Sequence, residues 1–248
     1  MRKPFRYAWY FFRCFFVFKN PISVIFHYVR KISPGENIVK LRNGLKIFLS
    51  GYPHDIITVF VVVVKEDYGK VVRDDIVIDI GANIGVFSVY AAAMGAKKVF
   101  SYEPTNEAYE VLLRNISSNR FEDIIIPYRL AVTEANGKAV RIPLKSSPYN
   151  RILDGNASEP HDVVSTVSLE SILKKNGIDQ LDLLKIDCEG EEYRILLNTD
   201  ASIFQKIKTI RMEYHAGPLE DLISFLRNRN FHTVYHNTDS AILWFSRT

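Results

Sequence analysis

From Val71 onward, short apolar runs alternate with longer amphipathic segments. The apolar runs are DIVIDIG, KKVFSYEP, IIIPYRLAV, LDLLKID, KTIRMEYH and FHTVYH, and most are separated by helical patterns such as EAYEVLLRNISSN, SLESILKKNG and LEDLISFLRNRN. Strands that alternate with helices form parallel strands joined by crossover helices. The pattern therefore predicts an α/β fold built on an open, doubly wound sheet.

Two segments of this part break the alternation. The runs FHTVYH and SAILWFSR are joined by a short Asn-Thr-Asp loop, so we expect the last strand to run antiparallel to its neighbour. The segment 137–162 is rich in turn-forming residues. It predicts a hairpin followed by a mobile loop, and we expect this loop to help choose the substrate.

The chain before Val71 has a different pattern. NIVKLRNGLKIFLSG contains two alternating runs joined by Asn43-Gly44, which is the strongest short-range signal for a β-hairpin. The segment 55–68 is ambiguous, because its run of four valines favours a strand while its length and polar ends allow a helix. We expect an N-terminal extension over residues 1–50 and one larger domain over residues 51–248.

Composition supports one sizeable folded core. Of the 248 residues, 47% are hydrophobic and 24% are charged, which is typical of a globular α/β domain and argues against disorder. Cys14 and Cys188 lie far apart in the sequence, so no disulfide framework can be inferred. We expect a reducing, cytoplasmic environment, membrane-peripheral if the N-terminal segment binds lipid.

The net charge of +4 conceals a strongly basic front end. Residues 1–50 carry ten Lys or Arg residues and a single acid, Glu36. The apolar run within it, residues 7–18, is interrupted by Arg13 and falls short of the roughly 20 residues that a membrane-spanning helix needs. It also lacks the small-residue cleavage site of a signal peptide.

The periodicity of this front end predicts an amphipathic helix. On a helical wheel Arg2, Arg6 and Arg13 cluster on one side, and Phe11, Phe15 and Phe18 lie roughly opposite them. Such a helix over residues 1–31 suits peripheral contact with an anionic membrane surface. Packing of its aromatic residues on the domain or on a second protomer is an equally weighted alternative. Nucleic acid is the less favoured partner, because no further basic groove is evident.

The stretch VIDIGANIGVFS reads as a strand, a glycine-containing turn and the start of a helix. A dinucleotide fingerprint would require glycine at positions 81, 83 and 86, but the chain has Gly81, Asn83 and Val86. Asp79 at the strand end would repel a pyrophosphate and attract a cationic amino group. The motif therefore argues against a nicotinamide-dependent oxidoreductase, which we keep as an alternative class.

A second acid ends the next predicted strand. Glu103 in VFSYEP lies eighteen residues after Gly85, where a carboxylate can accept both hydroxyls of a ribose. A ribose together with an ammonium group indicates S-adenosylmethionine. A helix cap and a turn acid are the structural alternatives for Asp79 and Glu103 taken singly.

These motifs resemble the FkbM-type S-adenosylmethionine-dependent methyltransferases. The resemblance is carried by VIDIGANIG, SYEP, LLRNISSN, LAVTEANG, TVSLESIL, LLKIDCEGEEYRIL and MEYH, which occur in the family's order over residues 68–248. It implies a Rossmann-like class I fold with a seven-stranded sheet of order 3-2-1-4-5-7-6, and methylation of a hydroxyl on a sugar, polyketide or glycolipid. It also implies that the segment 55–68 is a helix leading into the cofactor site.

The resemblance also implies roles for individual residues. Asp79, Gly81, Asn83 and Gly85 would line the methionine part of the cofactor, and Glu103 would hold its ribose. Many class I methyltransferases carry an acid after the third strand, where this chain has RLAVTE. The adenine would then rest on backbone groups around Ala131.

Methyl transfer to a hydroxyl requires alignment and a group that takes the hydroxyl proton. We expect Asp187 and Glu189, after the fourth strand, to converge with Glu213 and His215, after the fifth. His215 is the favoured base because its ordinary pKa of about 6.5 leaves it mostly neutral at pH 7. Asp187 and Glu189 would orient it or bind sugar hydroxyls.

Three further expectations concern the same strand ends. Lys185 should be buried in the sheet, where a partner such as Glu213 on the adjacent strand would satisfy it. Glu191 and Glu192 read as helix-start or solvent-facing acids. No metal is assigned, since nothing in the spacing requires one, although two acids and a histidine leave metal-assisted transfer as an alternative. A non-catalytic adaptor of the same fold is the remaining alternative class.

Overall fold

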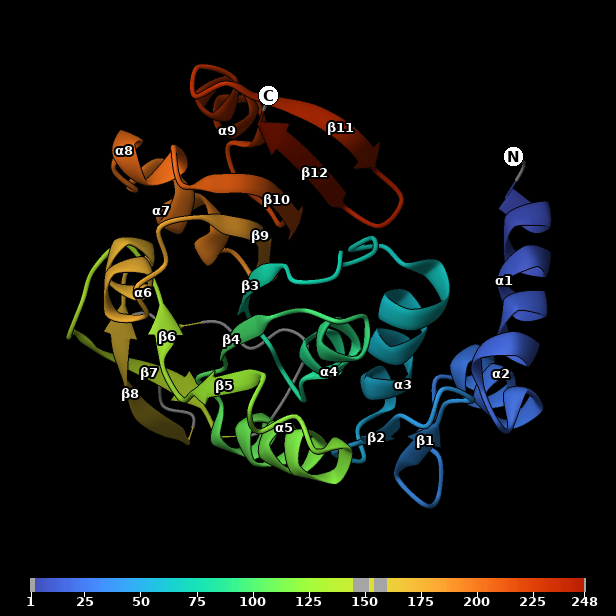
Figure 1. Cartoon of the computed structure of the whole chain (residues 1–248). Coiled ribbons are helices and arrows are strands. Elements are labelled where there is room, and N and C mark those ends of the chain that lie inside the picture. The colour runs from blue at the N-terminus through green and yellow to red at the C-terminus, as the bar shows by residue number, and fades with distance from the viewer. Residues whose placement is uncertain (1–2, 145–151, 154–159, 248) are drawn as a thin grey trace.

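A seven-stranded sheet forms the centre of the protein in the computed structural model, which describes residues 3–144, 152–153 and 160–247 (Figure 1). The strands of this sheet are β3 (Ile76–Ile80), β4 (Lys98–Tyr102), β5 (Ile125–Tyr128), β9 (Leu181–Ile186), β10 (Ile207–Glu213), β11 (Phe231–Asn237) and β12 (Ile242–Arg247). Their spatial order is β11-β12-β10-β9-β3-β4-β5. This is the order 3-2-1-4-5-7-6 expected from the resemblance, so the fold prediction is confirmed.

The directions of the strands also follow the prediction. β3, β4, β5, β9 and β10 pair in parallel, whereas β12 is antiparallel to both β10 and β11. The carboxyl ends of β3, β4, β9 and β10 therefore meet at one edge, beside the point where the strand order reverses. Ligands of open α/β sheets bind at this kind of edge.

Helices cover both faces of the sheet, because alternate residues of each buried strand point to opposite sides. Val77 belongs to one hydrophobic core and its neighbour Ile78 to the other. The first face carries α4 (Val86–Ala93) and α5 (Asn106–Asn119). The second carries α6 (Leu169–Lys175), α7 (Glu191–Leu197), α8 (Ala201–Phe204) and α9 (Leu219–Arg227).

A small second sheet lies after β5. It contains β6 (Ala131–Val132), β7 (Ala139–Pro143) and β8 (His161–Val167), in the order β6-β8-β7. β7 pairs antiparallel with β8, whose residues lie mostly beyond the segment 137–162 in which we expected both a hairpin and a loop. Residues 145–151 and 154–159 of that segment lie outside the described residues.

The N-terminal part consists of short helices and a hairpin. α1 (Lys3–Val17) and α2 (Pro21–Arg30) precede β1 (Ile38–Lys40) and β2 (Lys46–Phe48), which pair antiparallel around Asn43-Gly44 as expected. The ambiguous segment is helical, as the resemblance implied: α3 (Pro53–Val59) continues into a π-helix, η1 (Phe60–Lys65). Pro53 suits the first helical turn because its missing N–H has no partner there in any case.

The extension packs on the domain with both basic and aromatic side chains. Arg13 lies 2.8 Å from Glu66, and Arg6 lies 3.2 Å from Asp239. Phe18, directly after α1, is fully buried, and Phe11 packs against the same hydrophobic core. The alternative that the aromatic residues pack on the domain therefore holds for these two, whereas Phe15 is 47% exposed. Arg2 lies outside the described residues.

Within the described residues no helix has the length and hydropathy of a membrane-spanning segment.

One buried side chain connects the hairpin to the domain. Asn115 of α5 donates hydrogen bonds from Nδ2 to the carbonyl oxygens of Phe48 and Ile84, and its Oδ1 accepts from the amide of Phe48. The side chain is fully buried, so water cannot replace it as the hydrogen-bond partner of these three backbone groups. The hairpin and the loop after β3 are thereby held at the same point on α5.

We expect Asn115→Ala to lower the free energy of unfolding by about 3 kcal/mol, because buried backbone groups would lose their hydrogen-bond partner. Urea denaturation at constant pH measures this change. The control is Asn106→Ala on the exposed part of the same helix, which should stay within about 0.5 kcal/mol of the parent. Equal stability of both variants would contradict this account of the junction.

Candidate active site

A cavity of about 440 Å³ opens at the carboxyl edge of the sheet. This volume lies within the range of small-molecule sites. One part of its wall is apolar and includes Ala108, Leu130 and Val132, while the opposite part contains Asp187, Glu213 and other polar groups. The cavity therefore combines an apolar region with an acidic region next to the sheet.

The turn after β3 approaches the neighbouring strand end very closely. Gly81 has φ +73°, and a Cβ atom built on it would lie 1.7 Å from the carbonyl oxygen of Asp187. Any side chain would thus force the two strand ends apart. Gly85 also has positive φ, and a Cβ there would lie 2.3 Å from Leu112 of α5. Gly81 lines the cavity and Gly85 packs behind it.

Asp79 lies beneath the cavity and is not part of its lining. Its carboxylate is fully buried, accepts a hydrogen bond from Ser88 and lies 3.0 Å from Nζ of Lys185. The expected pairing of Lys185 with Glu213 is therefore wrong. The register of the sheet explains the difference, since Asp79 on β3 stands directly opposite Lys185 on β9.

Lys185 connects several parts of the site. Nζ donates to the carbonyl oxygen of Gly81 at 2.8 Å and lies 3.8 Å from Asp187. Burial alone would lower the pKa of Lys185, but the charges of Asp79 and Asp187 outweigh burial and raise it. The ammonium is therefore charged at pH 7, and it neutralises Asp79.

Glu103, at the end of β4, is held by the backbone. Its Oε1 accepts from the amide of Thr105 at 2.7 Å, and its Oε2 accepts from the amide of Asn83 at 2.9 Å. Asn83 itself has φ +50°, a conformation that asparagine tolerates better than most residues. Both residues line the cavity, as does Ala131 at the start of β6.

The acidic region centres on the hydroxyl of Tyr68. This oxygen lies 2.8 Å from Oδ2 of Asp187 and 3.2 Å from Oε2 of Glu213. A phenol has one hydrogen, so it can donate to only one of the two carboxylates at a time. Both hydrogen bonds can form at once when the second carboxyl group is protonated and donates its hydrogen to the Tyr68 oxygen.

Glu213 is the carboxyl group suited to hold that proton. Burial raises the pKa of Glu213, the negative charge of Asp187 raises it further, and together they bring it to about 7. Asp187 instead has the ammonium of Lys185 nearby. Glu213 can therefore gain and lose a proton near neutral pH.

His215 is held between two other acids. Its Nε2 lies 3.2 Å from Glu189, and its Nδ1 lies 3.0 Å from Glu192. These hydrogen bonds, first that of Glu189 and then that of Glu192, raise the pKa of His215 to about 11. At pH 7 the imidazole is protonated and has no lone pair with which to take a proton, which argues against the role of base expected from the sequence.

Glu192 has a structural position that the sequence did not indicate. It begins α7 as expected, but its carboxylate is fully buried instead of facing solvent. Besides His215, it accepts a hydrogen bond from the amide of Gly190. Although burial alone would raise the pKa of Glu192, the hydrogen bonds from His215 lower it. The pair therefore fixes the start of α7 against the end of β10.

The same region contains three groups with the donor types of a cation site. Single atoms of Asp187, Glu213 and His215 lie within 4.8 Å of one another. A histidine ligand must be neutral, however, and both nitrogens of His215 are engaged with carboxylates. Among the described residues, these three groups would hold a cation only if His215 gave up its proton and one of these hydrogen bonds.

Sequence reasoning missed two contributors to this site. Tyr68 precedes β3 in an irregular segment and is distant in sequence from both of its partners. The helical segment α3–η1 places His54, Ile57 and Val61 on the cavity wall. No local signal marks these residues, although the implied helix at 55–68 pointed to the correct segment.

A doubly wound sheet of order 3-2-1-4-5-7-6, a glycine turn after its first strand and an acid after the second define a class I methyltransferase fold and site. The model of the family described as the methyltransferase FkbM domain matches residues 79–233, more than half of the chain. The chain belongs to the FkbM methyltransferase family, and its cofactor is S-adenosylmethionine.

Curated relatives are distant in sequence. The hexuronic acid methyltransferase AglP of Haloferax volcanii is 23% identical over 147 residues, which cover 58% of this chain and 58% of AglP. The 31-O-demethyl-FK506 methyltransferase FkbM of Streptomyces tacrolimicus is 24% identical over 196 residues, covering 64% of this chain and 74% of that protein. The chain thus spans little more than half of AglP.

A solved structure supports the fold. The methyltransferase FkbM from Methylobacillus flagellatus KT superposes with a TM-score of 0.50 at 12% identity, covering 92% of this chain and 59% of that one.

We expect Lys185→Met to lower the free energy of unfolding by about 3 to 5 kcal/mol, because it leaves the buried carboxylate of Asp79 without its counter-charge. The affinity for S-adenosylmethionine, measured by isothermal titration calorimetry, should also fall, because Lys185 donates a hydrogen bond to the carbonyl oxygen of Gly81.

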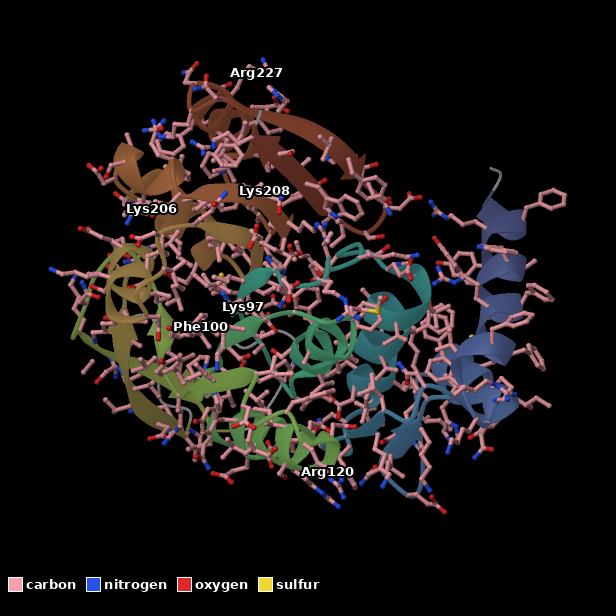
Figure 2. All side chains as sticks on the ribbon, viewed as in Figure 1. Lys97, Phe100, Arg120, Lys206, Lys208 and Arg227 are labelled. Carbon is pink, nitrogen blue, oxygen red and sulfur yellow. The ribbon has the colours of Figure 1, made fainter. Side chains whose placement is uncertain are left out.

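Lys208→Met is the matched control. Lys208 lies on the same sheet, is labelled in Figure 2, and is 3.9 Å from Asp182 with its side chain largely exposed. Exposed pairs of this kind contribute at most about 1 kcal/mol. Equal losses in the two variants would contradict a special role for the buried pair.

Proposed function

We propose that the protein transfers a methyl group from S-adenosylmethionine to a hydroxyl oxygen of a sugar, glycolipid or related metabolite. The observation that carries this proposal is the group formed by Tyr68, Asp187 and Glu213, which places a carboxyl group with a pKa of about 7 on the wall of the cavity. A hydroxyl acceptor has a proton to lose, and such a carboxyl group can take it.

The cavity fits the cofactor in three places. Glu103 keeps free lone pairs on both oxygens for the two ribose hydroxyls. The apolar wall around Ala131 suits the adenine ring. Asp187 lines the cavity beside Gly81, so we assign it the ammonium of the methionine part in place of Asp79, whose charge Lys185 already neutralises.

When bound, S-adenosylmethionine supplies the methyl group as a sulfonium electrophile. Glu213 accepts the proton of the acceptor hydroxyl at a carboxylate oxygen. Tyr68 donates its hydrogen bond to whichever neighbouring carboxylate is ionised, which keeps Glu213 oriented in both protonation states. Burial makes Glu213 more basic than an ordinary carboxylate.

His215 and Glu189 then have a binding role. The imidazolium is a fixed positive charge between Glu189 and Glu192, and it holds the end of β10 in place. Glu189 has φ +55°, a strained conformation that is typical of residues at functional sites. Both line the cavity, where Glu189 can accept hydrogen bonds from sugar hydroxyls.

The names of the relatives are consistent with this acceptor class. One is called a hexuronic acid methyltransferase and another a 31-O-demethyl-FK506 methyltransferase. The family is one of methyltransferases, which opposes the nicotinamide-dependent oxidoreductase kept as an alternative. A non-catalytic adaptor of the same fold would lose the cofactor acids, and the presence of Asp79 and Glu103 argues against it.

Incubation with isotope-labelled S-adenosylmethionine and, separately, glycan, lipid and small-molecule fractions of the cell envelope tests the function directly. We expect mass spectrometry to show the gain of one labelled methyl group on oxygen. Label on nitrogen or carbon would contradict O-methylation, and no label in glycan, lipid or small-molecule fractions would favour the adaptor.

The pH dependence of turnover tests Glu213. The base acts when ionised, so kcat should be low below the pKa of Glu213 and rise with pH through about 7. Glu213→Gln should lower kcat about 100-fold or more and abolish this rise, with cofactor affinity retained. Glu220→Gln, at an exposed position of α9, is the control and should keep the parent profile.

His215→Gln distinguishes the two candidate bases. We expect the rise near pH 7 to persist in this variant, with KM for the acceptor increased, because His215 holds a binding residue and does not take the proton. If the rise disappears from His215→Gln and persists in Glu213→Gln, the assignment of the base is reversed.

A further inference from the structure

Each of the two N-terminal helices exposes a row of large apolar side chains. On α1 these are Phe5, Trp9, Phe12 and Phe16, and on α2 they are Ile22, Phe26 and Val29. Their spacings of three and four residues place each set on one helix face. Each of the seven is between 51% and 73% exposed. We call these seven residues the aromatic ridge.

The rings of the ridge touch one another along α1. The ring centroids of Trp9 and Phe12 lie 5.7 Å apart, and those of Phe12 and Phe16 lie 5.0 Å apart. Both helices lie at the edge of the molecule, with α3 between α2 and the central sheet (Figure 1). Side chains of α1 project away from the rest of the chain (Figure 2). A surface of this kind in a water-soluble domain marks an interaction site.

The opposite side of the same helices is firmly attached, so the outward direction of the ridge is fixed. Phe60 of η1 stacks on Tyr28 with ring centroids 3.8 Å apart and contacts Phe11 edge to face. Arg13 forms an ion pair with Glu66. The helices cannot turn the ridge inward without breaking these contacts.

The charged residues of the segment that carries the ridge have one sign. Residues 1–35 contain no aspartate or glutamate. Lys19, Arg30 and Lys31, at the ends of the two helices, are exposed. An apolar face rich in aromatic rings with cations at its border complements an anionic lipid surface, in which rings enter the headgroup region and cations contact phosphates.

We propose that the aromatic ridge docks the protein on an anionic lipid bilayer, with α1 and α2 lying in the plane of the surface. This differs in detail from the wheel-based expectation, because Arg6 and Arg13 pair with acids of the domain and the membrane-facing cations are Lys19, Arg30 and Lys31. The proposal does not depend on the identity of the methyl acceptor.

A second copy of the chain fits the ridge less well. Two-fold pairing brings the same patch of both copies together. Cations would then face cations, and no acid within residues 1–35 could pair with them. The charge pattern thus favours lipid over self-association.

Co-sedimentation of the whole protein with vesicles tests the proposal. We expect binding to vesicles of phosphatidylglycerol and phosphatidylcholine, weaker binding at high salt, and little binding to phosphatidylcholine alone. The triple variant Trp9→Ser, Phe12→Ser, Phe16→Ser should bind at least about tenfold more weakly, because it removes three exposed rings.

The matched control removes three exposed apolar residues elsewhere, through Val72→Ser, Val163→Ser and Val234→Ser. It should bind vesicles like the parent. Circular dichroism and S-adenosylmethionine affinity verify that each variant is folded. In the parent, anionic vesicles should shift the fluorescence of Trp9 to the blue, and Trp9→Phe should lose most of this shift.

Two outcomes would overturn the proposal. One is equal vesicle binding by the ridge variant and the valine control. The other is a parent that ignores vesicles but forms a concentration-dependent dimer in sedimentation velocity, which the ridge variant no longer forms. That second result would assign the ridge to self-association.

Discussion

The buried ion pair between Asp79 and Lys185 sets the arrangement of the whole site. An ammonium at this depth is stable only beside a carboxylate, so the pair favours the register that places β3 against β9. The same ammonium binds the carbonyl oxygen of Gly81 and lies near Asp187. It thereby joins the glycine turn after β3 to the strand end that carries the acids. Its position in the middle of the sheet makes this connection independent of solvent.

The neighbours of each side chain at the strand ends determine its charge. Asp187 has Lys185 nearby, whereas Glu213 is partly buried and faces the charge of Asp187, so the pKa of Glu213 is raised to about 7. His215 is fixed as a cation by Glu189 and Glu192. The proposed proton transfer and the proposed binding of sugar hydroxyls thus fall to different side chains of one cavity, for electrostatic reasons alone.

The N-terminal helices are connected to this cavity through one aromatic residue. Phe60 continues the helical segment α3–η1, whose other side chains line the cavity, and it packs against Tyr28 and Phe11 of the extension. Because the extension shares one hydrophobic core with the domain, the aromatic ridge and the cavity belong to one packed unit. A membrane bound at the ridge would therefore have a defined orientation relative to the site.

Local periodicity and turn chemistry were enough to predict the alternation of strands and helices, the hairpin at Asn43-Gly44, the glycine turn and the carboxylates at the strand ends. The family resemblance added the strand order. The pairing of charges followed from the folded chain: Lys185 faces Asp79 and not Glu213, Glu192 is buried against His215, and Tyr68 lies between Asp187 and Glu213. Register and packing decide such pairings, and they bring together residues far apart along the chain.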